Sequence, residues 1–567
     1  MTGPLERAGL YGRTVVHLRP AQLAHRVRLR AQQEALRRWP DRFEQRWTPP
    51  ARPPAGVPSA FLAVDASAPP ACGTFTDLAA GRFRFLDEEV ALGDPPAWDP
   101  PDASQLWLYH HHYWEWAWTL AAHPDRDAAR RVFARQLTSW LEATRFGRWN
   151  AWAPYPTSLR AWVFVNVYED LALGGPADQP LLAEIRRHAG FVRHNLELDV
   201  GGNHLIKNLK ALVGLGVFLG DDDLTSLATQ HLVAQLPIQV LPDGGHFELS
   251  PSYHGQVLGD LVDIAELLAA ARAPAVPGLD DAITRMRRWL GLMLLPDGDV
   301  AVFNDGERLG RTRLAALRPG PPAAEPLTVL ADSGYVVIRP NDRLHLVVDV
   351  GAPCPADLPA HAQADCLGFE LSIDGQRVVV DPGTSVYGSG PQRAWERSTR
   401  AHSTIEVDGI DQTEVWGAFR AGRLARATLE RAEVAADGVI VSASHDGYRH
   451  LPGAPVHRRR WTASGSVVQI DDEVVGDGVH DLRHHLLVCG TATVAEETHT
   501  SDTITVTGPT DATQTWVDAR YATGFGQFHP ARSLVTTARS PLPATFTTRI
   551  EAAPLPGGAS GPVDPPM

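Results

Sequence analysis

Three side chains in separate segments could together remove a proton next to a carboxylate. Asn203 follows two glycines, Tyr253 closes the run Leu-Ser-Pro-Ser-Tyr, and His361 stands in Pro-Ala-His-Ala-Gln-Ala-Asp. An amide can stabilise negative charge that builds up on a carboxylate, and a phenol and an imidazole can move protons. The combination predicts removal of a proton from the carbon beside a carboxylate.

Each of these residues also has a structural explanation. Asn203 precedes an apolar helical stretch and could cap the helix. Ser250 and Pro251 suit the N-cap and first position of another helix, which places Tyr253 in its first turn. The positive end of the helix dipole there would ease formation of a tyrosinate. Alternatively, Tyr253 packs as a half-buried aromatic, and His361 is a structural loop histidine.

Further residues could hold an anionic sugar. An arginine can bind a carboxylate or sulfate through two hydrogen bonds, and an imidazole or phenol can orient a sugar. The substrate-binding candidates are His204, Glu248, Arg160, Tyr387 and Arg400, and Arg393 and Arg397 belong with them as possible basic lining. The stretch 107–116 is dense in aromatic rings, which could stack on sugars, but we favour helix core for it.

A weaker pattern concerns metal binding. Asp381 follows a predicted strand, and His402 comes 21 residues later. A carboxylate and an imidazole that converge on a sheet could hold zinc. Two ligands alone are also explained by a direct hydrogen bond between them, so both explanations stay open.

The hydrophobic periodicity changes along the chain. From 104 to 310 apolar residues recur at helical spacing, for example from Leu205 through Leu209 and Leu212 to Leu219. After 326 the pattern alternates, and Asp374-Gly375 marks a hairpin turn. We predict an N-terminal helical and extended segment over 1–100, a helical domain over 101–325, a β-domain over 326–552 and a disordered tail over 553–567. The site would lie between the two domains.

Bulk properties exclude several classes of protein. The net charge is −14, which argues against nucleic acid as a partner. The chain has four cysteines in no paired motif and no run of 18 apolar residues, so neither a disulfide scaffold nor a membrane span is expected. No signal-like segment is seen, which predicts a cytoplasmic protein unless export uses another route. The sequence does not indicate an oligomeric state.

Several long segments, taken in order, resemble the heparinase II/III-like polysaccharide lyases. They are 13–22, 106–113, Gly202–Ala211, Asp243–His254, Gly368–Gly375, Arg397–Thr404 and 408–416. The resemblance implies an N-terminal (α/α) toroid followed by a C-terminal antiparallel β-sandwich. It also implies an enzyme, a carbon–oxygen lyase that cleaves a uronic-acid-containing polysaccharide by β-elimination and leaves a 4,5-unsaturated uronate.

The resemblance assigns roles by position and shows one departure. Asn203 would neutralise the uronate carboxylate, and Tyr253 with His361 would remove the C5 proton and protonate the departing oxygen. No cofactor is required, but the family reads His-x-His at this loop, with the second His on a structural zinc together with Asp381 and His402. This chain has Gln363 at that position. An amide is a poorer zinc ligand than imidazole, so zinc is doubtful here.

Two other functions are compatible with these residues. One is a non-catalytic glycan-binding protein, which the changed metal loop and the lack of a signal-like segment favour. The other is a factor in exopolysaccharide assembly or turnover. The joint presence of Asn203, Tyr253 and His361 favours the lyase, with an acidic polysaccharide as its partner.

Overall fold

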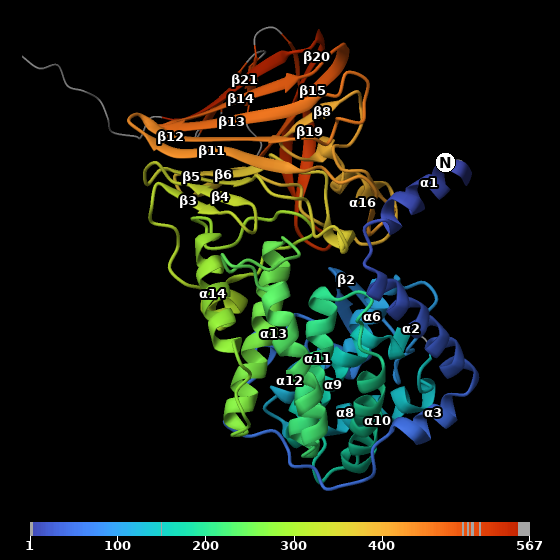
Figure 1. Cartoon of the computed structure of the whole chain (residues 1–567). Helices are drawn as coiled ribbons and strands as arrows, with labels where there is room; N and C mark the ends of the chain where they lie inside the picture. Colours follow the sequence, from blue (N-terminus) through green and yellow to red (C-terminus); the bar gives the residue numbers. More distant parts are fainter. Residues whose placement is uncertain are drawn as a thin grey trace, which may run out of the picture.

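Helices build the first half of the chain and antiparallel strands the second, as Figure 1 shows for this computed structural model. The structure describes residues 4–148, 150–489, 493–495, 498–500, 504–509 and 512–553. This order confirms the predicted fold class of a helical toroid followed by an antiparallel β-sandwich. The predicted disordered tail falls, after residue 553, outside the described residues.

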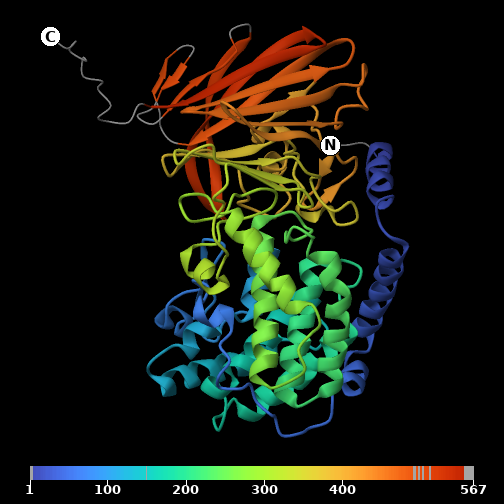
Figure 2. The same cartoon turned by 60° about the vertical axis from the view of Figure 1, so that its left-hand side comes forward.

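The N-terminal segment runs along the outside of both domains (Figure 2). Where the sequence predicted one helical stretch, the structure has α1 (Pro4–Val15), α2 (Pro20–Arg38) and α3 (Pro40–Trp47), with Pro20 and Pro40 opening new helices. Two short helices and a hairpin follow: α4 (Val64–Ser67), α5 (Phe75–Ala79), β1 (Arg82–Phe85) and β2 (Glu88–Ala91).

The helical domain packs its longest helices around apolar faces. Its helices are α6 (Gln105–Tyr113), α7 (Ala117–Ala121), α8 (Arg126–Ala143), α9 (Pro154–Leu171), α10 (Asp178–His194), α11 (Gly202–Leu219), α12 (Asp222–Gln239), α13 (Pro251–Ala270), α14 (Leu279–Leu292) and α15 (Arg311–Leu317). The predicted face of α11 is buried at Leu205, Leu209 and Leu212. Because α11 is apolar nearly all round, it lies inside the domain, between α9, α12 and α13.

The described part of the β-domain has two large antiparallel sheets that face each other and a small sheet of β9 and β10. Its strands are β3 (Leu327–Leu330), β4 (Tyr335–Ile338), β5 (Leu344–Asp349), β6 (Phe369–Ile373), β7 (Gln376–Val379), β8 (Ile405–Val407), β9 (Val415–Trp416), β10 (Arg420–Ala421), β11 (Ala427–Ala435), β12 (Gly438–His445), β13 (Val456–Ser464), β14 (Val467–Val475), β15 (Val479–Cys489), β16 (Thr493–Ala495), β17 (Thr498–Thr500), β18 (Ile504–Thr507), β19 (Thr513–Gly524), β20 (Gln527–Pro541) and β21 (Ala544–Ala552). One sheet has the order β11-β12-β13-β14-β21-β18-β17-β16. The other runs β19-β20-β15-β7-β6-β5-β4-β3, with β8 beside β15.

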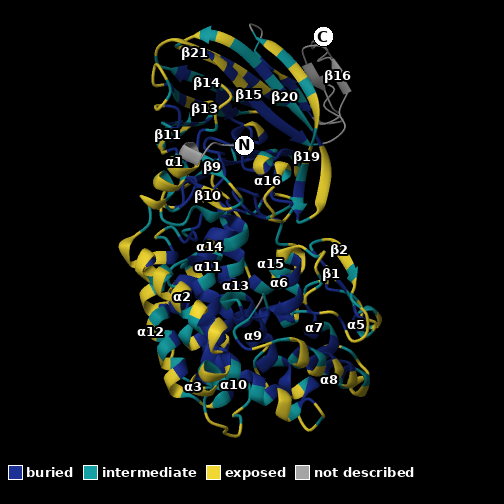
Figure 3. Cartoon of the chain, turned by 90° about the vertical axis from the view of Figure 1, so that its right-hand side faces the viewer, coloured by how far each residue is buried: buried dark blue, intermediate teal, exposed yellow. Residues whose placement is uncertain are grey.

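Local sequence explains the register and core of these sheets. The predicted hairpin over 369–380 forms β6 and β7, and its turn residues Asp374 and Gly375 both have positive φ. Burial alternates along β12 and β13, which directs every second side chain into the space between the sheets. Trp461, Val441 and Leu486 meet there with the inner residues of β4 to β6. Figure 3 shows this dark-blue interior separate from that of the helices.

A hydrogen bond at the start of α13 joins the two domains. The carbonyl of Leu249 accepts from the Tyr335 hydroxyl of β4 at 2.6 Å. The segment between α14 and α15 binds the same helix start: the Asn304 side chain donates to the Leu249 carbonyl at 3.0 Å, and the Ser250 hydroxyl donates to the Asp305 carbonyl at 2.7 Å. These bonds fix the start of α13 against β4 and against the segment between α14 and α15. In the described part of the chain, no helix is long and apolar enough to cross a membrane.

Candidate active site at the domain junction

Asn203 lies in the first turn of α11, one end of which faces the β-domain. Its backbone N–H donates to Glu248 Oε1 at 2.7 Å, and its side-chain Nδ2 donates to Oε2 at 2.9 Å. The N-cap is Gly201, so the alternative that Asn203 caps the helix is wrong. A Cβ on Gly202 would stand 2.0 Å from Glu248 Oε1, which explains a glycine at this position. The carboxylate thus holds the amide in place.

Tyr253 lies where the sequence predicted, in the first turn of α13. The Ser250 side chain accepts from the Tyr253 backbone N–H at 3.2 Å, and Pro251 opens the helix. The Tyr253 hydroxyl is 2.6 Å from the hydroxyl of Tyr387. Burial, with Tyr387 adding to it, raises the pKa of Tyr253 well above its ordinary value. Burial thus acts against the easier tyrosinate formation that was expected from the helix end.

His361 contacts Tyr253 directly and lies near Glu248, the residue that also binds Asn203. It ends a short turn, η2 (Pro359–His361), and its ring centroid lies 3.8 Å from that of Tyr253. Its Nδ1 is 3.2 Å from Asp305 Oδ2, and its Nε2 is 3.4 Å from Glu248 Oε2. The structure therefore brings Asn203, Tyr253 and His361 together around Glu248, although they come from three distant segments.

The sequence did not indicate Asp305. This residue is fully buried, and its carboxylate lies within hydrogen-bond distance of His361 Nδ1. Arg393 pairs with both of its oxygens at 2.5 Å. Burial alone would raise the pKa of Asp305, but the Arg393 guanidinium outweighs it and holds the pKa well below the ordinary range. The only signal in the sequence is Asn304-Asp305-Gly306, which indicates a turn and nothing more. Arg393 was a candidate for the substrate, and here it pairs with Asp305 instead.

Among the other substrate-binding candidates, His204 and Tyr387 are partly exposed, whereas Glu248 is buried. His204 is partly exposed, stacks near Tyr155 at 4.3 Å and has its Nδ1 3.0 Å from Glu197. Burial opposes its charged form, but Glu197 outweighs burial and raises the pKa of His204. Tyr387 lies against Tyr253 and is partly exposed. Glu248 is 1% exposed and holds Asn203, which leaves little surface for a substrate.

The structure contradicts the prediction for Arg160. Its side chain is fully buried in the helical domain, where it donates to His188 at 2.8 Å and to the His112 carbonyl at 2.9 Å. The guanidinium also lies over the Trp140 ring. The sequence could not indicate which face of α9 points inward, and this arginine is part of the core. Trp107, Trp114 and Trp116 are buried too, as favoured for that stretch.

Arg400 lies apart from this group. It is exposed in the turn η3 (Thr399–Ala401), near Asp411. Among the described contacts, none joins Arg400 to Asn203, Tyr253 or His361. The structure therefore gives no support to its predicted role in substrate binding.

A group of buried side chains in the β-domain is suited to metal binding. Potential ligand atoms of Asp365, Asp381 and His402 all lie within 4.8 Å of one another, and all three residues are buried. His402 Nδ1 is 2.8 Å from Asp381, while both Asp365 oxygens and His402 Nε2 have no hydrogen-bond partner. Gln363 turns its Nε2 toward Asp305 at 3.1 Å. Carboxylate and imidazole are divalent-cation ligands, so the residues present fit such a metal, with Asp365 as a donor that the sequence did not indicate.

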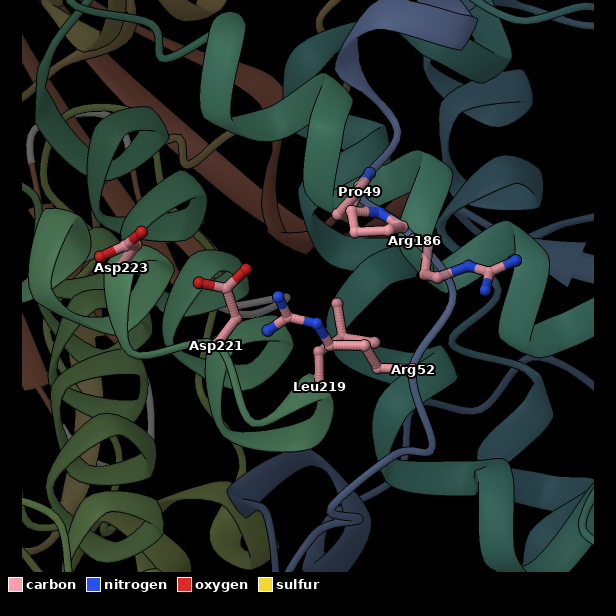
Figure 4. A pocket seen from close by; sticks show the side chains of 7 residues that line it. Pro49, Arg52, Arg186, Leu219, Asp221 and Asp223 are labelled. Atoms are coloured by element: carbon pink, nitrogen blue, oxygen red, sulfur yellow. The ribbon is translucent and has the colours of Figure 1, made fainter.

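A pocket lies at the opposite end of α11. Figure 4 shows its lining, in which the Arg52 guanidinium points toward Asp221 while the Arg186 guanidinium points away from it. The α11 helix is about 27 Å long at 1.5 Å per residue, so this pocket is remote from Asn203. None of the predicted site residues lines it.

The class that the fold defines is a two-domain protein with a helical toroid and a β-sandwich, and an amide, a phenol and an imidazole lie between the two domains. Comparison with known families is more specific. Residues 106–317 match the family Heparinase II/III N-terminus, and residues 322–552 match Heparinase II/III-like, C-terminal. The chain belongs to the heparinase II/III family.

The individual relatives share low sequence identity with this chain. FtsZ-localized protein C of Caulobacter vibrioides is 28% identical over 68% of this chain and 66% of its own length. The Heparin-sulfate lyase of Pedobacter heparinus is 26% identical over 55% of this chain and 53% of its own length. The match thus spans between about half and two thirds of these relatives.

Solved structures extend the likeness over nearly the whole chain. A crystal structure of heparinase III superposes with a TM-score of 0.73 at 17% identity, covering 94% of this chain and 92% of the other. Chondroitin AC lyase of Streptomyces coelicolor gives 0.55 at 14% identity, over 90% and 82%. At such identities the likeness establishes the fold.

Proposed function

We propose that this chain is a polysaccharide lyase that cleaves a uronic-acid-containing polysaccharide by β-elimination. The convergence of Asn203, Tyr253 and His361 at the domain junction carries the proposal. Three segments separated by 50 or more residues supply the amide, the acid and the base that the reaction needs. Membership of the heparinase II/III family and the name of the Pedobacter relative support the same activity.

The raised pKa of Tyr253 supports a division of roles. A phenol that stays protonated at neutral pH suits the acid, and the imidazole of His361 suits the base. His361 Nε2 takes the C5 proton, the C4–C5 double bond forms, and the C4–O bond breaks. Tyr253 gives its hydroxyl proton to the departing oxygen. Solvent then takes the proton from His361 and returns one to Tyr253, whose hydroxyl is 2.6 Å from that of Tyr387.

The remaining residues stabilise the charge that develops. A primary amide has two N–H groups, so Asn203 can keep its bond to Glu248 and offer the second proton to the uronate carboxylate. Asp305 accepts from His361 Nδ1, fixes the ring and stabilises the imidazolium, in the way a carboxylate assists a histidine base. Arg393 keeps Asp305 ionised in its buried position.

An absorbance assay tests the proposal, since the unsaturated uronate absorbs ultraviolet light. We expect the purified protein to release this chromophore from at least one of hyaluronan, chondroitin, heparan sulfate, alginate and a bacterial uronate exopolysaccharide. Tyr253→Phe removes the acid and should lower kcat by about 100-fold or more. Tyr168→Phe is the matched control, because its hydroxyl bonds Asp178 inside the helical domain. Binding to a polymer without chromophore release would favour the glycan-binding alternative.

We also propose that Asp365, Asp381 and His402 hold a structural divalent cation. When bound, the cation would neutralise buried carboxylates and anchor the loop that carries His361. The proton transfers above use side chains of the chain alone. Elemental analysis should find about one equivalent of metal after dialysis, and a chelator should lower the Tm. Asp365→Asn should abolish retention, and Gln363→His should raise the affinity for zinc. An unchanged Tm with no retained metal would contradict the site.

A further inference from the structure

The arginines around the proposed site already have partners. Arg393 forms both of its ion-pair bonds with Asp305 and also donates to the Ala418 carbonyl. Arg397 donates to the carbonyls of three residues, Ala362, Gly417 and Arg420. Both side chains are buried, at 0% and 1% exposure. Neither guanidinium is presented to a ligand.

Arginines somewhat farther out are paired as well. Arg313, whose charge reaches Glu307, lies 3.4 Å from Asp65. Arg26 lies 3.6 Å from Asp199. Arg393, which acts on Asp305, and Arg313, which acts on Glu307, are thus already hydrogen-bonded or ion-paired, and so is Arg26.

The remaining charges at the site are mostly negative. Glu248 lies 3.4 Å from His361, and Glu197 lies 3.0 Å from His204. Glu307 is exposed and its charge reaches Tyr387. With a chain charge of −14 behind them, these carboxylates make the site unfavourable for a densely anionic ligand.

Aromatic rings, in place of unpaired cations, provide surface that a ligand can contact. Tyr387 contacts Phe525 at 4.8 Å and Phe419 at 5.3 Å, and Phe419 is 42% exposed. Across the junction, Tyr155 stacks near His204 and is partly exposed. Aromatic faces bury apolar area without charge, which suits the C–H faces of sugar rings.

Together these features point to one class of substrate. We propose that the chain acts on an unsulfated glycan, in which single uronate carboxylates, spaced by neutral sugars, are the only anionic groups. This inference rests on the proposed lyase function. One carboxylate per repeat can be met by Asn203 and His204, whereas each sulfate would face carboxylates and find no free guanidinium.

A matched pair of polymers tests the inference. The first is the unsulfated glucuronate–N-acetylglucosamine backbone, and the second is the same backbone with N- and O-sulfates, at equal length. We expect kcat/KM to be at least about tenfold higher on the unsulfated polymer. Equal or faster cleavage of the sulfated form would overturn the inference and leave the lyase activity established.

Binding separates the two proposals if neither polymer is cleaved. Titration calorimetry with octasaccharides of both kinds would be run on Tyr253→Phe at about 50 and 300 mM NaCl. Tighter binding of the unsulfated form, with little dependence on salt, supports the substrate class even if the lyase proposal fails. Tighter binding of the sulfated form, a steep salt dependence or no binding of either would overturn it.

A change of charge at Glu307 provides a gain-of-function test. Glu307→Lys replaces an exposed carboxylate beside Tyr387 by a cation and should raise the sulfated-to-unsulfated ratio of kcat/KM by about threefold or more. Glu307→Gln is the neutral control and should give a smaller rise. A ratio that does not move in either variant, with the Tm unchanged, would contradict a site selected by charge.

Discussion

A buried carboxylate that must stay ionised makes the site sensitive to acid. The pKa of Asp305 is depressed in the folded protein by Arg393, so its stabilising contribution is fully present above the ordinary pKa of about 3.9. It is lost as the pH falls toward the folded-state value. We expect the free energy of unfolding, measured with urea, to drop steeply below about pH 4.

Asp305→Asn isolates this contribution. The variant leaves Arg393 buried without a counter-ion and removes the acceptor for His361, so it should lose about 3 kcal/mol of stability at pH 7. Its free energy of unfolding should vary less with pH below about pH 4 than that of the wild type. Equal acid dependence in both proteins would show that the depressed pKa belongs to other groups.

Part of the candidate site could be predicted from the sequence. Asn203, Tyr253 and His361 were predicted because their segments resemble a family and carry proton-transfer groups. Asp305 was not, because its importance comes from Arg393, 88 residues away, and from burial. Arg160 was misjudged for the same reason, since a guanidinium in the core and one facing a ligand look alike in sequence.

At the scale of the element, the first turn of α11 depends on the absence of a side chain at Gly202. A methyl group on Gly202 would overlap Glu248, and the backbone there has a φ of +54°, which disfavours any side chain. Gly202→Ala should therefore push Glu248 away from Asn203 and lower kcat by about tenfold or more. The measurement is kcat and Tm side by side.

Gly278→Ala is the control that distinguishes the effect of backbone strain from the effect of steric overlap. Gly278, at the N-cap of α14, has φ of +79°, and a methyl group added there would have nothing within 4 Å of it. The variant should lose about 1 kcal/mol of stability and keep its activity. If both variants lost activity equally, the contact between Gly202 and Glu248 would not be the cause.

Periodicity predicted the helices and hairpins well, because burial on one face is a local property of the sequence. The breaks at Pro20 and Pro40 were missed, since the surrounding residues keep a helical pattern through both prolines. The order of strands in the two sheets was not predictable either. It depends on which distant strands pair, and alternation specifies a buried face without naming a partner.

At the scale of the whole molecule, the first two helices together tie the two domains. In α1, Arg13 donates to both oxygens of Glu414 at 2.7 and 2.6 Å, and Thr14 donates to the Ala421 carbonyl, both in the β-domain. In α2, Gln32 donates to the His194 carbonyl of the helical domain at 2.8 Å. We expect Arg13→Ala and Glu414→Ala to show a coupling energy of about 0.5–1 kcal/mol in a double-mutant cycle.

The readout for that cycle is chemical unfolding, with hydrogen exchange in α1 as a second measure. Loss of either partner should speed exchange in α1 before it affects α11. Arg37→Ala is a suitable control, because Arg37 meets Glu34 within one exposed helix. Strictly additive losses in the cycle would mean that the pair does not join the domains.

The position of β21 has a consequence for how the protein is made. Although it is the last strand in sequence, β21 lies inside its sheet, between β14 and β18. While the ribosome is still adding residues 544–552, β14 and β18 each present an open edge that another chain could pair with. The sandwich can therefore close only once synthesis has passed residue 552, and the helical domain has time to fold first.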